Sequence, residues 1–296
     1  MPAKLIQALL RLFSKIPINV NRRLGRALGR LFMTMNKKYR HIVMDNLRLA
    51  FPQQDQAWIQ QTAKKCFEHL GMIVCELPYL AAAPMEQIMA LSRIHGLEIL
   101  QPFIDKGYKN SLVLTGHIGN WEWNGVVMGA HGLHGNLVAR PLDNRAFDIV
   151  VNRWRERTGQ KVVSKHISAR KLLPLLRKGE NLVILLDQNM DWYEGHWVNF
   201  FGQPACTNYG LALLAMHTNM LVVPTYGFRA DDGCFDIYIG QPIELCSSGD
   251  RRRDVWQNTQ NYTTALENII RQKPEQWLWL HQRWKTKNYC PWPREH

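Results

Sequence analysis

The chain has 296 residues, of which 46% are hydrophobic and 21% are charged. These proportions exclude a disordered chain and a collagen-like repeat, and the length allows one large domain or two small ones at about 150 residues each. Lysine and arginine outnumber aspartate and glutamate by 37 to 24, which gives a net charge of +13. Such an excess indicates a polyanionic partner, whether nucleic acid, an anionic membrane surface or a phosphorylated substrate.

The first forty residues carry ten basic side chains and no acidic one. Apolar residues from Leu24 to Met35 recur at helical spacing, and the opposite face of this predicted helix holds Arg22, Arg23, Arg26 and Arg30. A cationic amphipathic helix is typical of a segment lying in a membrane interface. The alternative is a helix that docks its apolar face on the protein's own core and leaves its basic face in solvent.

No segment approaches the length of about 20 apolar residues that a membrane-spanning helix needs. Arg11 interrupts the first apolar run, which disfavours a secretory signal peptide. We therefore expect residues 1–40 to form a basic arm that lies on a membrane without crossing it, on its cytoplasmic side. Six scattered cysteines without a C-x-x-C pair favour free thiols in a reducing compartment.

Residues 41–92 follow a helical pattern and predict a helical subdomain, with Pro78 and Pro84 bracketing an alanine-rich connection. From about residue 94 short apolar runs alternate with helical patterns, and these runs are 112–114, 137–138, 162–163, 182–186, 221–223 and 235–239. Strands that alternate with helices predict an α/β sheet with parallel portions. We therefore expect one α/β domain over residues 93–296.

The predicted strand at 111–114 leads directly into the segment T-G-H-I-G-N-W-E-W at 115–123. Its two glycines allow a sharp turn, and it contains a histidine and a glutamate. His117 falls at the carboxyl end of the strand, where ligands bind in open α/β sheets, and Asn120 is a predicted N-cap for the next helix. If the helix start brings Glu122 back to His117, the carboxylate would fix the imidazole tautomer and stabilise its protonated form. The other ring nitrogen could then deprotonate a hydroxyl, which suits direct acyl transfer to an alcohol. The alternative is a buried histidine held by a helix residue.

Later segments add candidate ligand-binding residues. Arg140–Asn144 follows a predicted strand, and Asp187 and Gln188 end another. Arg153, Arg155 and Arg157 could clamp a phosphate or carboxylate, or could form a solvated helix face. Residues 200–205 are interpreted as a loop with an apolar wall, and Thr207 as a cap for a helix around 211–216. Tryptophan and arginine mixed at 274–285 suit either an interface or the core.

Familiar cofactor and metal motifs are missing from the sequence, which has no Walker A loop, no G-x-G-x-x-G and no H-E-x-x-H. His131 and His134 are spaced like metal ligands, but the glycines beside them favour a loop. We therefore expect neither a metal nor a cofactor.

Taken in order, these blocks resemble the bacterial lipid A late acyltransferases, the lauroyl and myristoyl transferases of lipopolysaccharide synthesis. The matching blocks are G-H-x-G-N-W-E at 116–122, R-P-x-D-N at 140–144, D-Q at 187–188, F-F-G-x-P-A-x-T at 200–207 and P-E-Q-W-L-W-L-H-x-R-W-K at 274–285. The resemblance implies a glycerol-phosphate-acyltransferase-like α/β fold with a helical membrane-associating subdomain. It also implies acyl transfer from acyl carrier protein to a lipid A precursor at the cytoplasmic face of the inner membrane.

Residue by residue, the resemblance places the catalytic dyad on His117 and Glu122. It places substrate-binding positions on Arg140, Asn144, Arg155, Asp187 and Gln188. The arm of this chain is shorter and more basic than the hydrophobic anchor of many relatives. Related enzymes acylate other membrane lipids, so another phospholipid or glycolipid is the alternative acceptor. A nucleic-acid-binding protein would also carry a charge of +13, but no basic-aromatic recognition motif is present.

Overall fold

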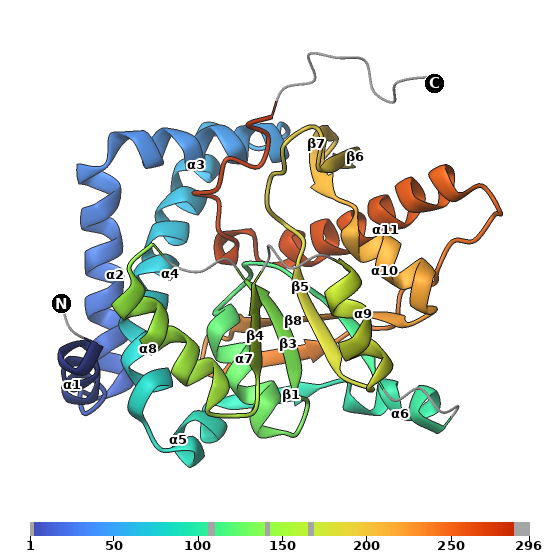
Figure 1. Cartoon of the computed structure of the whole chain (residues 1–296). Coiled ribbons are helices and arrows are strands. Elements are labelled where there is room, and N and C mark those ends of the chain that lie inside the picture. Colours follow the sequence, from blue (N-terminus) through green and yellow to red (C-terminus); the bar gives the residue numbers. More distant parts are fainter. Residues whose placement is uncertain (1–2, 106–109, 140–142, 165–168, 287–296) are drawn as a thin grey trace.

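A seven-stranded sheet forms the centre of the molecule, in the order β1-β9-β8-β2-β5-β3-β4 (Figure 1). The computed structural model describes residues 3–105, 110–139, 143–164 and 169–286. Neighbouring strands run parallel except β8 and β9, which are antiparallel. The strands are β1 (Ser92–His95), β2 (Ser111–Thr115), β3 (Gly135–Ala139), β4 (Lys161–Ser164), β5 (Asn181–Leu185), β8 (Leu221–Arg229) and β9 (Phe235–Ile239).

All six strands expected from the apolar runs are confirmed, and they form a mostly parallel sheet flanked by helices, as predicted. The sequence pattern did not reveal β1, whose four residues alternate between half-buried and exposed. It also missed a separate hairpin of β6 (Gly195–Phe200) and β7 (Gln203–Asn208), whose turn holds Phe201 and Gly202 at positive φ. The prediction of a loop over 200–205 is therefore wrong, because these residues pair across the hairpin.

Helices occupy most of the first ninety residues and then alternate with the strands. They are α1 (Ala3–Phe13), α2 (Ile18–Met35), α3 (Lys37–Ala50), α4 (Gln56–Ala82), α5 (Met85–Ala90), α6 (Leu97–Asp105), α7 (Trp121–Ala130), α8 (Arg145–Glu156), α9 (Ala169–Arg177), α10 (Gly210–Thr218) and α11 (Arg251–Gln272), with the short 3₁₀ helix η1 (Pro274–Gln276). The expected break at Pro78 is wrong, since α4 continues through it to Ala82. Thr207 does not cap α10, because it lies in β7 and its hydroxyl accepts from the buried Arg283.

Helix α2 packs against α4 through glycines, which lets the two backbones approach closely. A Cβ atom added at Gly25 would lie 2.6 Å from the Gly71 carbonyl oxygen, and one added at Gly29 would overlap the Phe67 carbonyl. The polar and glycine side of α2 therefore faces the protein. Its apolar stripe is exposed to solvent, and the residues of that stripe that are at least 37% exposed are Val20, Leu24, Leu28, Leu31, Phe32 and Met35.

The arginine face of α2, which the alternative interpretation left in solvent, is partly buried. Arg22 is only 4% exposed, because it lies in the α2–α4 interface and its Nε donates to Glu76 over 2.6 Å. Arg30, by contrast, forms an exposed pair with Glu68. The alternative in which the apolar stripe docks on the protein's own core is also contradicted by the exposure of that stripe.

Glu76 lies at the centre of a buried ionic network and is fully buried. Besides Arg22, it accepts hydrogen bonds from both terminal nitrogens of Arg229 on β8 and, over 3.0 Å, from the amide of Asn120. Burial alone would raise the pKa of Glu76, but the two guanidinium groups lower it, so the carboxylate is charged. One side chain of α4 thus connects α2, the sheet and the turn before α7.

The tryptophan-rich segment near the C-terminus packs in the core. Trp277 and Trp279 are at most 3% exposed, and Arg283 is fully buried and donates to the Cys206 carbonyl. Of the two alternatives left open for residues 274–285, the structure supports core packing. The five cysteines in the described ranges are free thiols, as expected.

We predict that Glu76→Gln lowers the free energy of unfolding by about 3–5 kcal/mol, because it leaves two buried guanidinium groups without a counter-charge. The matched control is Glu68→Gln, which removes the partner of the exposed Arg30 between the same two helices and should cost at most about 1 kcal/mol. Urea unfolding at pH 7 measures both. Equal losses in the two variants would contradict a special role for the buried network.

Candidate active site

His117 and Asp187 meet at the carboxyl ends of two adjacent parallel strands. Thr115 of β2 is in register with Leu185 of β5, so the residues two positions further along each strand emerge side by side. The His117 Nδ1 lies 2.9 Å from Asp187 Oδ1, and the His117 backbone N–H donates to Oδ2 over 2.7 Å. The sheet topology thus aligns the imidazole with a carboxylate 70 residues away.

The environment of Asp187 keeps it ionised although its side chain is only 2% exposed. Gly116 makes room for it, since a Cβ there would lie 3.0 Å from the carboxylate carbon, and the Trp277 indole N–H donates to Oδ2 over 2.8 Å. Burial alone would raise the pKa of Asp187, but the charge and hydrogen bonds of His117, with the Trp277 bond, lower it to about 2.

The Asp187 contact leaves one ring nitrogen of His117 available. The Asp187 carboxylate accepts a hydrogen bond from the N–H at Nδ1, so the neutral imidazole carries its lone pair on Nε2. Burial would lower the pKa of His117, but Asp187 and, to a smaller extent, Glu122 outweigh burial and raise it. The ring is 17% exposed, its edge packs against Trp121, and the Gln188 amide nitrogen lies 3.4 Å from Nε2.

The structure corrects the expected contact between His117 and Glu122. Glu122 lies in the first turn of α7, and its carboxylate is directed toward α8, where Arg155 donates to it from Nε over 2.9 Å and from Nη2 over 2.5 Å. The Trp154 indole also donates to it, over 3.3 Å. Because two guanidinium nitrogens and an indole hold Glu122, the residue that fixes the imidazole is Asp187.

The remaining predicted site residues have separate environments. Asn144 caps α8, its side chain accepting from the backbone N–H groups of Ala146 and Phe147. The guanidinium of Arg155 is engaged by Glu122, whereas Gln188 stands beside His117. Arg140 lies outside the described residues. The structure therefore brings together His117, Asp187 and Gln188, with the Glu122–Arg155 pair as a neighbouring unit.

Two elements remote in sequence hold the turn that carries His117. The Gly119 N–H donates to the Gln276 carbonyl over 2.7 Å, and the Leu278 N–H donates to the His117 carbonyl over 3.1 Å. Asn120 caps α7 by accepting from the Trp123 N–H, while its amide donates to Glu76. Sequence reasoning missed Glu76 and Trp277. An acidic residue in an otherwise apolar helical stripe was the only signal for Glu76.

Within the described ranges, no group of three or more histidine, cysteine, aspartate or glutamate side chains is arranged to hold a metal ion.

The sequence profile of the bacterial lipid A biosynthesis acyltransferases matches residues 3–286. The chain is 28% identical over 281 residues to the lipid A biosynthesis lauroyltransferase of Escherichia coli strain K12, covering 92% of this chain and 88% of that protein. It is 23% identical over 277 residues to the lipid A biosynthesis acyltransferase of Haemophilus influenzae strain Rd, covering 93% and 85%. A phosphatidylinositol mannoside acyltransferase of Mycobacterium tuberculosis is 28% identical over 196 residues, covering 64% and 59%.

We predict that Asp187→Asn lowers the pKa of His117, so that a larger fraction of the imidazole is neutral at a given pH below neutrality. Glu122→Gln should lower the pKa less, because Arg155 already balances the Glu122 charge. Titration of the His117 ring signals by NMR measures both shifts. A larger shift in Glu122→Gln than in Asp187→Asn would restore Glu122 as the partner of His117.

Proposed function

Because the chain belongs to the bacterial lipid A biosynthesis acyltransferase family, it is an acyltransferase, and we propose that it moves a fatty acyl chain from acyl carrier protein to a hydroxyl of a lipid A precursor. The observation that carries this proposal is the His117–Asp187 contact, which leaves a basic nitrogen at the carboxyl end of the sheet. The net charge of +13 suits both an acidic carrier protein and a phosphorylated lipid.

In the proposed reaction, His117 Nε2 removes the proton from the acceptor hydroxyl as its oxygen attacks the thioester carbonyl. The carbon–sulfur bond then breaks, and the leaving thiolate takes the proton from the imidazolium. Asp187 stabilises the imidazolium between these two steps through the 2.9 Å contact at Nδ1. The products are the ester and the free thiol of the carrier, and His117 returns to its neutral form.

The polar groups around His117 position the imidazole and the acceptor in this reaction. Glu122 adds negative potential at the imidazole, and Arg155 fixes Glu122 with two hydrogen bonds, so we assign both residues to positioning. Gln188 lies close enough to Nε2 for its amide to orient the acceptor hydroxyl. Arg140 and Asn144 remain predicted contributors to acceptor binding.

A second acceptor is supported by the match to a phosphatidylinositol mannoside acyltransferase. The same base and carboxylate would serve an alcohol of another phospholipid or glycolipid, because the chemistry at the thioester is unchanged. Assays that offer a lipid A precursor and a phosphatidylinositol mannoside in parallel separate the two acceptors.

We assign membrane association to α1 and α2, as part of a glycerol-phosphate-acyltransferase-like fold. Residues 1–40 would form the membrane arm, 41–92 a helical subdomain and 93–296 the catalytic domain. Leu5, Leu9, Leu12 and Phe13 of α1 are exposed, like the stripe of α2. Within the described part of the chain, no helix combines the length and apolar character needed to cross a bilayer. Peripheral attachment to the cytoplasmic face of the inner membrane fits these features, with anionic headgroups facing Arg23 and Arg26.

We predict that His117→Ala lowers kcat for acyl transfer from acyl carrier protein by about 10²–10⁴-fold, the usual contribution of a general base. The matched control is His131→Ala, which removes an exposed histidine at the end of α7 and should leave kcat unchanged. A steady-state assay with a lipid A precursor measures both variants. Near-parental turnover by folded His117→Ala protein would refute the mechanism.

We predict that replacing Leu24, Leu28 and Leu31 together by serine weakens binding to anionic liposomes by about 10–100-fold, because each leucine would otherwise bury apolar area in the bilayer. The fold should survive, since all three side chains are at least 45% exposed. Leu97→Ser on α6 is the control.

Arg23→Gln with Arg26→Gln should weaken binding to the same liposomes mainly at low salt, because salt screens the attraction between arginines and anionic headgroups. Co-sedimentation across a salt series measures all three, and parental binding by the triple variant would exclude the α2 stripe as the membrane surface.

A further inference from the structure

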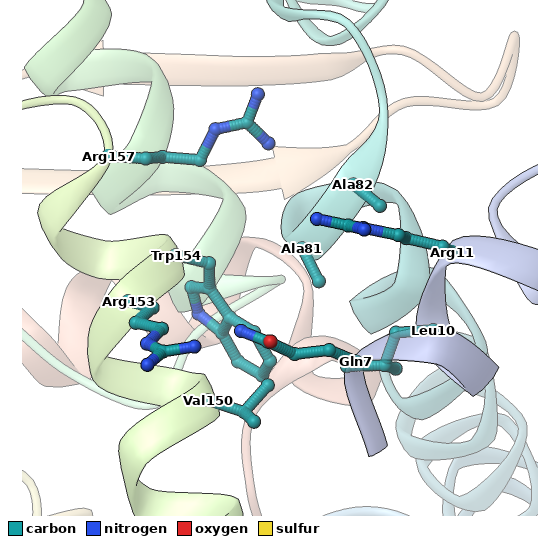
Figure 2. A pocket seen from close by; sticks show the side chains of 9 residues that line it. All are labelled: Gln7, Leu10, Arg11, Ala81, Ala82, Val150, Arg153, Trp154 and Arg157. Atoms are coloured by element: carbon teal, nitrogen blue, oxygen red, sulfur yellow. The ribbon is translucent and has the colours of Figure 1, made fainter. Parts of the chain in front are cut away.

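A cavity of about 140 Å³ lies between α1 and α8, beside the end of α4 (Figure 2). Gln7 and Arg11 line it from α1, and Arg153 and Trp154 of α8 line the opposite wall together with Arg157, the residue that follows this helix. The four remaining lining residues are small or apolar. The reaction proposed above uses none of these nine residues.

The cavity concentrates positive charge without an internal counter-charge. Three of its nine lining residues are arginines and none is acidic. Arg157 donates to the backbone carbonyls of Leu80 and Ala83, over 2.8 and 2.9 Å. The ion pairs formed within the described ranges do not include Arg11 or Arg153. Three guanidinium groups that line one hollow without an acidic lining residue form a site suited to an anion, and the planar guanidinium matches the geometry of phosphate oxygens.

The position of the cavity connects it both to the exposed apolar surface and to the candidate active site. Arg11 belongs to α1, whose outer side exposes Leu9 and Leu12. Trp154 forms part of the cavity wall, and its indole donates to Glu122, the neighbour of His117. A lipid whose chains lie against α1 would therefore hold its headgroup between the apolar surface and the reacting groups.

We propose that this cavity, the Arg11–Arg153–Arg157 pocket, binds a phosphate monoester of the lipid acceptor. The proposal rests on the acyl transfer proposed above and assigns the pocket as a subsite of that reaction. Arg11 and Arg153, which have no carboxylate partner among the described residues, contact the phosphate oxygens. Arg157, fixed by two carbonyls, supplies a positive charge of defined position.

The first test uses the full chain and a double variant, Arg11→Gln with Arg153→Gln. The charge-matched control is Arg251→Gln with Arg253→Gln, two exposed arginines at the start of α11, far from α1 (Figure 1). Each protein is assayed with a lipid A precursor and with the same lipid after phosphatase treatment. We expect the preference of the parent for the phosphorylated acceptor, measured as the ratio of kcat/KM values, to fall at least about 10-fold in the pocket variant through KM, and to persist in the control.

The second test distinguishes a lipid phosphate from free phosphate and does not depend on turnover. Binding is measured to phosphatidylcholine vesicles that contain either phosphatidate, a phosphate monoester, or phosphatidylglycerol, a diester. Inorganic phosphate is titrated separately. We expect the parent to prefer phosphatidate vesicles and the pocket variant to lose that preference. Pocket-dependent binding of inorganic phosphate with no vesicle preference would overturn the lipid assignment.

The outcomes separate the two proposals. If the parent transfers acyl chains and the pocket variant keeps the parental acceptor ratio, the pocket inference is wrong and the proposed function stands. If the parent transfers to no acceptor, the proposed function fails and the acceptor subsite fails with it, whereas the vesicle measurement still shows whether the arginines bind a lipid phosphate. If the pocket variant and the control variant lose the preference for the phosphorylated acceptor equally, net charge alone explains the loss. That result would overturn the assignment of the pocket as a phosphate site.

Discussion

The buried carboxylate of Glu76 holds the architecture together. It is fully buried, and it accepts from Arg22 on α2, from Arg229 at the end of β8 and from Asn120 before α7. A charge in such a place is stable only when surrounding donors replace the water that it has lost. The helical layer, the sheet and the turn that carries His117 therefore depend on one another through a single side chain.

The position of His117 follows from this constraint together with strand register. Parallel pairing of β2 with β5 brings Asp187 to the same level as His117, and the C-terminal segment closes over both through Trp277 and the Gly119–Gln276 hydrogen bond. A loop alone would let the imidazole adopt several orientations. Here the carboxylate, the indole and the main-chain bonds define one orientation, in which Nε2 faces away from Asp187 and lies beside the Gln188 amide.

The N-terminal helices show why an amphipathic pattern does not reveal which side is buried. Apolar residues of α2 would ordinarily be expected to face a protein core. Gly25 and Gly29 instead make the opposite side smooth enough for close contact with α4, and Arg22 finds a buried partner there. The apolar stripe remains on the outside. The membrane association proposed above would bury this surface among lipid acyl chains.

The sequence by itself determined the alternation of strands and helices, the turn at 115–123 and the family, because apolar periodicity, glycine and capping residues act over a few neighbouring positions. It also located His117 at a strand end. Only the tertiary structure decided that Asp187, rather than Glu122, contacts the imidazole, that Arg22 is buried, and that Arg11 and Arg153 share a cavity. Each of these contacts joins residues far apart in the chain. Strand order, register and helix packing select such partners, and local patterns carry no information about them.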